Sequence, residues 1–193
     1  MENADLLIKK PMKTDYTGFV IDSSRKWALA EFEAMKHGPL PYSTHLTAVA
    51  GIVACYTRDE DVIAAAWLHD IVEDFRDQFT VADVRHMTND RVATLVDLLT
   101  DPVGPRKLVK PISLARIAKD ADACLIKCAD RFHNQSTAII DSHGVGRRFV
   151  KMYVDEFEDF STALFPSIPY REYHPLIAGL EDQYAVMKMI MVD

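Results

Sequence analysis

The chain has 193 residues, of which 49% are hydrophobic and 26% are charged. This length and composition fit one globular domain, with or without a short appendage, and allow a sizeable core. The net charge of −7 argues against general nucleic-acid binding, which needs a basic surface. An anionic substrate would therefore need a local positive site, such as a bound metal ion with a few basic side chains.

The three cysteines, Cys55, Cys124 and Cys128, lie in apolar surroundings. Their odd number argues against a disulfide framework, and we expect Cys124 and Cys128 to be buried small side chains rather than zinc ligands. No apolar run reaches membrane-spanning length, and no long apolar stretch follows the N-terminal lysines. We therefore expect a cytoplasmic protein without a signal peptide or a membrane partner.

Apolar residues recur at spacings of three and four and glycine is sparse, which predicts an all-α chain. We expect a first helix over 24–36, capped by Ser23 or Ser24, and a break at 38–41. A second helix should begin near Thr44, and a third near Asp59 that continues through Ile71. The third is unusually apolar, so we expect it in the middle of the bundle.

The second half of the chain also reads as a series of helices separated by turns. Proline and glycine mark loops at 101–105 and 142–146, and a further break at 166–169. The predicted helices cover 81–87, 89–99, 112–119, 123–140, 147–164 and 172–191.

The sharpest local feature is the run from His69 to Asp74, His-Asp-Ile-Val-Glu-Asp. If one helix carries it, His69, Asp70, Glu73 and Asp74 share one flank within about a turn. One imidazole and three carboxylates are costly there unless a cation holds them together. The alternative is an exposed acidic helix end. The spacing alone leaves both interpretations open.

Two further segments carry candidate polar residues. Asp130 and Asn134 share a helix face after an apolar stretch, which is also typical of an ordinary amphipathic helix with an Asp-Arg pair. His45 follows Pro41-Tyr42, and a lone histidine at a helix start usually belongs to the capping region. Neither segment by itself predicts a site.

Taken in order, the three segments resemble a known family. His45, His69-Asp70 and Asp130 look like the H…HD…D pattern of the HD phosphohydrolase superfamily. The run at 69–74 resembles the HDxVED box of its RelA/SpoT-type alarmone hydrolases. The run at 125–134 resembles their LIKLADRLHN box, and Pro41-Tyr42 with His45 resembles their PYxxH box. The resemblance covers about residues 27–164 and implies a compact, all-α HD-domain bundle with a metal site between its central helices.

The resemblance also implies roles for particular residues. The positions that match the family's metal ligands are His45, His69, Asp70 and Asp130. The positions that match its catalytic groups, which place water and accept its proton, are Glu73, Asp74 and Asn134. The ion is expected to be one divalent cation, commonly Mn²⁺, although ligand type alone does not select it. The implied reaction removes the 3′-pyrophosphate of (p)ppGpp to give GDP or GTP and pyrophosphate.

The substrate contacts are less well defined by the sequence. Lys107 and Arg116 belong to a basic stretch where the family binds phosphate, and Arg148 and Tyr153 are further candidates. A solvated basic face and core packing of the tyrosine are the competing interpretations. The family's longer basic loop before PYxxH, which holds the guanine nucleotide, is shortened here to residues 36–40. This departure puts the base specificity in question.

Three functions therefore remain open. The first is (p)ppGpp hydrolysis, the second is an HD nucleotidase for another nucleotide such as a deoxynucleotide or NADPH, and the third is a catalytically silent HD module that binds a nucleotide or a partner. We expect a small-molecule nucleotide as partner, and a homo-oligomer is left open. The expected division is an N-terminal extension (1–23), an HD hydrolase domain (24–165) and a C-terminal helical extension (166–193) that packs on the same domain.

Overall fold

The computed structural model describes residues 18–169 and 174–192. Within them the chain is a bundle of helices with one two-stranded hairpin, which confirms the predicted all-α fold. The helices are α1 (Phe19–Glu31), α2 (Tyr42–Tyr56), α3 (Glu60–Leu68), α4 (Ile71–Asp74), α5 (Val81–Met87), α6 (Asp90–Leu99), α7 (Arg106–Ile117), α8 (Ala121–Ile140), α9 (Gly146–Leu164), η1 (Phe165–Ser167) and α10 (Pro175–Val192). No helix of this part of the chain is both long and apolar enough to cross a membrane.

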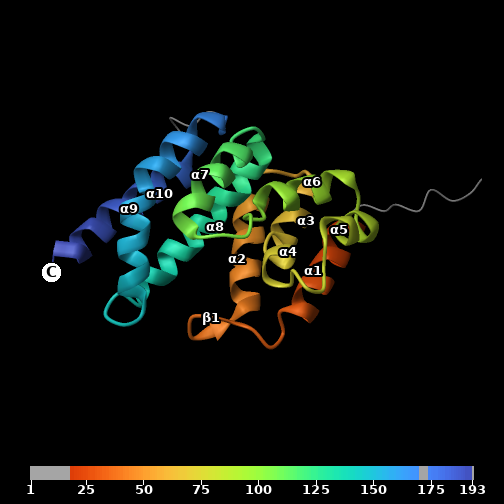
Figure 1. Ribbon diagram of the computed structural model, residues 1–193, viewed down its shortest axis with the longest axis horizontal. Coiled ribbons are helices and arrows are strands. Elements are labelled where there is room, and N and C mark those ends of the chain that lie inside the picture. Colours follow the sequence, from red (N-terminus) through yellow and green to blue (C-terminus); the bar gives the residue numbers. More distant parts are fainter. Residues whose placement is uncertain (1–17, 170–173, 193) are drawn as a thin grey trace, which may run out of the picture.

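Helix α3 lies at the centre of one half of the bundle, as its apolar sequence predicts. Six of its nine residues are buried, and it packs against α1, α2, α6 and α8 (Figure 1). Helix α8 joins the two halves, because it contacts α2 on one side and both α9 and α10 on the other. Cys124 and Cys128 are buried in α8, as expected, while Cys55 is exposed.

The first helix begins earlier than predicted. It starts at Phe19, directly after Gly18, whose φ of 79° suits glycine better than residues with a Cβ. Ser23 is not an N-cap, because its hydroxyl donates back to the carbonyl oxygens of Phe19 and Val20 inside the helix. Ser24 lies buried one residue later in the same helix, so the predicted cap at either serine is wrong.

The predicted break before the second helix is a small hairpin. Strand β1 (Lys36–His37) pairs antiparallel with strand β2 (Leu40–Pro41), and Gly38 turns the chain with a φ of 60°. Helix α2 then begins at Tyr42, two residues before the predicted start. The hairpin thus delivers His37 and Tyr42 to the same end of α2.

The run from His69 to Asp74 is not one continuous helix, which corrects the expectation from spacing. Helix α3 ends at Leu68, His69 and Asp70 form a turn, and the short α4 follows. The Asp74 amide still donates to the Asp70 carbonyl at 2.8 Å, so the two acidic residues stay close to the same turn. His69 and Asp70 therefore lie at the junction between α3 and α4, where the direction of the backbone can change.

The remaining helices agree with the prediction within a few residues, with one exception. Helix α5 covers the predicted range, and α6 is capped by Asn89, whose side chain accepts from the Val92 amide. Helix α7 begins at Arg106, six residues before the predicted start, and contains Pro111 in its interior. The predicted start of the last helix at 172 lies outside the described residues, which show α10 from Pro175.

Candidate metal and catalytic site

Four side chains from three places in the chain converge on one point. His45 comes from α2, His69 and Asp70 come from the turn after α3, and Asp130 comes from α8. The Nε2 atoms of the two histidines are 3.2 Å apart. Asp70 Oδ2 lies 3.5 Å from His45 Nε2 and 3.0 Å from His69 Nε2. Asp130 Oδ1 lies 3.5 Å from the first and 3.9 Å from the second.

This donor set fits a divalent cation. Both histidines are only 1% exposed, and the potential ligand atoms of His45, His69 and Asp70 all lie within 4.8 Å of one another. The His69 Nδ1 atom is 2.8 Å from the carbonyl oxygen of Ala66, so this nitrogen carries the proton and donates. That tautomer leaves the Nε2 lone pair directed at the cluster, as a metal-binding histidine requires.

The charges of the cluster depend strongly on one another. Burial lowers the pKa of His69, but Asp70 and Asp130 raise it more, to about 9 overall. Burial raises the pKa of Asp130, yet the ammonium of Lys127 and the two histidines hold it well below its usual range. A cluster of this kind binds a proton when no metal cation compensates its two carboxylates.

Asp130 is fixed from two sides by its own helix. Lys127 Nζ lies 2.7 Å from Asp130 Oδ2, and the side-chain amide of Asn134 donates to Oδ1. Burial lowers the pKa of Lys127, but the negative charges of Asp130 and Asp70 raise it by more than burial lowers it. The pKa of Lys127 therefore lies above its ordinary value. The spacings of three and four residues place all three side chains on one face of α8.

Glu73 and Asp74 follow on α4, close to the cluster but outside it. Burial raises the pKa of Glu73, whose carboxylate accepts a hydrogen bond of 2.9 Å from the Asp101 amide. Burial and the negative charge of Asp70 raise the pKa of Asp74 to about 6. Carboxyl groups with pKa values raised toward neutrality are suited to accepting a proton in a reaction.

A cavity of about 180 Å³ opens onto these groups. It is lined by the acidic residues and Asn134, and by basic residues that include Arg106, Lys110, Lys127 and Arg131. Each of these four cations pairs with an acid: Lys110 with Asp101 at 2.8 Å, Lys127 with Asp130 at 2.7 Å, and both Arg106 and Arg131 with Glu156, at 2.6 and 3.1 Å. The cavity thus joins a cation-binding cluster to side chains that can bind phosphate oxygens.

The predicted substrate contacts fall in different places. Tyr153 lines this cavity, whereas Lys107 and Arg148 line a neighbouring groove between α7 and α9. Arg116 lies away from both: its guanidinium bonds the Asp97 side chain and the carbonyl oxygens of Asp97 and Thr100. The prediction that Arg116 binds substrate is not supported by its position, because its ion pair ties it to α6.

Several residues of the site were not predicted from the sequence. The hydroxyl of Tyr42 donates to Asp70 Oδ2 at 2.7 Å. His37 and His133 both pack against His45; the Nδ1 atoms of His45 and His133 are 2.9 Å apart. Lys127 and Arg131 stand inside the motif at 125–134, and their position beside Asp130 was the available signal.

Comparisons with known proteins agree with this geometry. The family model described as HD domain matches residues 25–145, more than half of the chain. A probable guanosine-3′,5′-bis(diphosphate) 3′-pyrophosphohydrolase of Synechocystis is 30% identical over 133 residues, which cover 64% of this chain and 17% of that protein. A probable GTP pyrophosphokinase of Mycobacterium leprae is 32% identical over 164 residues, which cover 72% of this chain and 20% of that protein.

The fold has a counterpart among solved structures. A metazoan ortholog of SpoT, described as hydrolysing ppGpp, superposes with a TM-score of 0.68 at 24% identity. The match covers 86% of this chain and 94% of the other. The chain spans a fifth or less of the length of the two bacterial relatives, so they share one region with it. On the family match and the converged histidine and aspartate residues, the chain belongs to the HD domain family.

Proposed function

We propose that this chain is a metal-dependent hydrolase that removes the 3′-pyrophosphate of (p)ppGpp. The observation that carries the proposal is the buried cluster of His45, His69, Asp70 and Asp130 beside a cavity rimmed with basic side chains. The name of the Synechocystis relative, with which the chain shares this region, supports the choice of substrate. The assignment of residues 24–165 as the hydrolase domain, with 166–193 as an extension, belongs to the same proposal.

The four clustered side chains would hold one divalent cation, for which we propose Mn²⁺. Such an ion, when bound, lowers the pKa of a coordinated water and offsets phosphate charge. Tyr42 restrains Asp70 through its hydroxyl, and Lys127 and Asn134 restrain Asp130. These contacts fix the carboxylates before the substrate arrives, which lowers the reorganisation needed in the reaction.

The proposed reaction needs one water and no covalent enzyme intermediate. The water oxygen attacks the phosphorus bound to the ribose O3′, and the bond between that phosphorus and O3′ breaks. Glu73 and Asp74 are the candidates to take the proton of the water, because the pKa values of both are raised. The ribose O3′ leaves with a proton, so the products are GDP or GTP and pyrophosphate.

A second class of substrate remains a candidate because the hairpin is short. The segment at 36–41 is short and contributes one exposed lysine, Lys36, so it offers little to hold a guanine nucleotide. An HD nucleotidase acting on a deoxynucleotide or on NADPH would use the same cluster and the same acids. A silent binding module would also have this fold but would turn over none of these compounds.

The test is hydrolysis of ppGpp by the purified protein with Mn²⁺, analysed for GDP and pyrophosphate beside a panel of deoxynucleoside triphosphates and NADPH. We expect release of pyrophosphate from ppGpp, and its loss in Asp70→Ala. Turnover of another nucleotide with inert ppGpp would reassign the substrate. Full activity in Asp70→Ala would overturn the site.

A further inference from the structure

The catalytic cavity is too small for the proposed substrate. Its volume is about 180 Å³, whereas pockets for drug-sized ligands measure roughly 300–1,000 Å³. A guanosine with four phosphates is at least as large as such ligands. The cavity can therefore take the pyrophosphate that is removed, while the nucleoside and its 5′-phosphates must lie in a second space that joins it.

The hairpin contributes none of its residues 36–41 to the cavity and packs against the cluster instead. The His37 ring stacks on His45 with centroids 4.6 Å apart, and His37 Nε2 lies 2.8 Å from Asn134 Oδ1. The Tyr42 ring packs edge-on against both histidines. These contacts cover the cluster where β1 leads toward α2, so a nucleoside would have to break them to leave in that direction.

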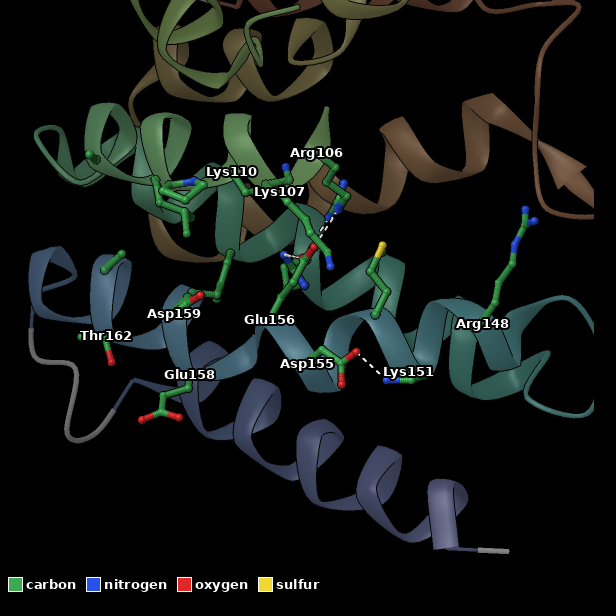
Figure 2. A pocket seen from close by; sticks show the side chains of 17 residues that line it. Arg106, Lys107, Lys110, Arg148, Lys151, Asp155, Glu156, Glu158, Asp159 and Thr162 are labelled. Carbon is green, nitrogen blue, oxygen red and sulfur yellow. Dashed lines mark hydrogen bonds and ion pairs between the residues drawn. The ribbon is translucent and has the colours of Figure 1, made fainter. Parts of the chain in front are cut away.

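The opposite side opens into a groove between α7 and α9. This groove has a volume of about 1140 Å³, and it shares Arg106, Lys110 and Arg131 with the catalytic cavity. Figure 2 shows the two helices with the groove's side chains between them. Its lining includes six apolar residues, Pro111, Leu114, Ala115, Met152, Phe160 and Ala163, and four acidic residues of α9, Asp155, Glu156, Glu158 and Asp159. Of these acids, Glu156 pairs with Arg106 and Asp155 pairs with Lys151. An apolar floor next to basic groups suits a flat base joined to phosphates.

Arg131 stands at the junction of the two spaces with unused donors. It is 5% exposed, and its guanidinium lies 4.6 Å from the Tyr153 ring centroid and 4.5 Å from that of Phe160. Its Nη2 reaches Glu156 at 3.1 Å, but its buried Nη1 has no hydrogen-bond partner among the described residues. A buried guanidinium nitrogen without a partner is costly, and a ligand oxygen would satisfy it.

Lys107 adds a second cation that no acid in the described residues pairs with. In Figure 2 its side chain extends from α7 toward α9 beside the Arg106–Glu156 pair, whereas Arg148 stands apart at the far end of the groove. Four of the six basic groups, Arg106, Lys107, Lys110 and Arg131, thus gather where the groove meets the catalytic cavity. Phosphates would lie at that end, and the base over the apolar floor farther along.

We infer that the groove between α7 and α9 binds the nucleoside and 5′-phosphates of the substrate, with Arg131 and Lys107 contacting the phosphates. This inference rests on the proposed function for the nature of the ligand. It assigns the nucleotide to the face opposite the short hairpin, and so accounts for a site that lacks a long basic loop there.

The test uses GDP, the product, as the probe, and measures its dissociation constant by calorimetry on the 193-residue chain. Ala115→Glu places a negative charge on the exposed part of the floor, and we expect it to weaken GDP binding at least tenfold. Ile112→Glu is the matched control, because it adds the same charge to an exposed position of α7 outside the groove. We expect that control to bind GDP within twofold of the wild type.

A second pair of variants removes charge instead of adding it. Lys107→Ala should weaken GDP binding about fivefold and reduce its dependence on salt, since one phosphate contact is lost. Lys119→Ala removes an exposed lysine beyond the end of α7 and should change neither. Equal GDP affinity in Ala115→Glu, Lys107→Ala and the controls would overturn the inference, as would absence of GDP binding to the wild type.

The outcomes also separate this inference from the proposed function. Wild-type hydrolysis of ppGpp with an unchanged KM in Ala115→Glu would overturn the groove and leave the activity standing. GDP binding that is sensitive to Ala115→Glu, without turnover of ppGpp, would support the groove and overturn the activity. A KM for ppGpp that rises at least tenfold in Ala115→Glu alone supports both.

Discussion

Removing the positive charge of Lys127 should reveal how the negative charges of the metal-binding cluster are compensated. Lys127 and Asp130 form an ion pair of 2.7 Å in which the side chains are 14% and 8% exposed. Lys127→Met keeps most of the apolar stem but leaves the Asp130 carboxylate buried without its partner. Loss of one member of a buried pair costs about 3–5 kcal/mol, so we expect the metal-free variant to lose about 3 kcal/mol of unfolding free energy.

A divalent cation in the cluster should offset most of that loss, because it supplies positive charge next to the same carboxylate. If the loss with saturating Mn²⁺ is about 1 kcal/mol, the variant gains about 2 kcal/mol of metal affinity relative to the wild type. By linkage this corresponds to a metal dissociation constant about 30-fold lower. The variant would thus be less stable without metal and yet bind it more tightly.

Urea unfolding with EDTA or with Mn²⁺ gives the two free energies, and calorimetry gives the metal affinity directly. The matched control is Lys26→Met, since Lys26 pairs with Asp22 on the surface, where the side chains are 70% and 48% exposed. We expect that control to leave the unfolding free energy nearly unchanged in both conditions, because solvent screens an exposed ion pair. Equal losses for Lys127→Met with and without Mn²⁺, or weaker metal binding, would refute the reasoning.

Four further variants test the site and its support. His69→Ala should abolish both Mn²⁺ binding, measured by calorimetry, and turnover. Glu73→Gln should lower kcat by about 100-fold and keep the metal affinity. Loss of Mn²⁺ binding in both variants would contradict the division between a metal ligand and a proton acceptor. In metal-free protein, the raised pKa of Asp74 means that the protonated form is favoured on folding. The stabilisation from this preference is complete below the ordinary value of 3.8 and is lost as the pH rises through about 6. Asp74→Asn should therefore melt higher than the wild type at pH 8, and the difference should shrink at pH 5; a constant difference would contradict the pKa shift. Gly146→Ala should lower the melting temperature without altering metal affinity, because its Cβ would lie 2.6 Å from main-chain carbonyl oxygens.

The cluster could be predicted from the sequence because three short motifs carry it. His45, His69-Asp70 and Asp130 were identified as candidates by their order and resemblance, and the structure brings their side chains together. The argument from helix spacing was wrong in detail, since the chain turns at His69 and Asp70. The convergence depends on packing between α2, α3 and α8, which spacing within one segment cannot report.

The substrate side was harder to predict, because it depends on which cations are already paired. Arg116 and Lys107 are equivalent in a basic stretch, yet one is bonded to Asp97 and the other faces the groove. Pro111 obscured the start of α7: a proline usually marks a helix start, but here the helix tolerates it after its first turn. These differences depend on tertiary contacts, which the local sequence does not reveal.

The contacts of the site also say something about how the protein acquires its structure. Its hydrogen bonds join residues that are 28 apart for Tyr42 and Asp70, 88 apart for His45 and His133, and 97 apart for His37 and Asn134. Contacts of such long sequence separation form only after large loops have closed. The cluster should therefore be completed late in folding, when α8 docks on α2. Metal affinity would then report whether the whole chain has reached its native arrangement, and partly folded forms would bind the ion weakly.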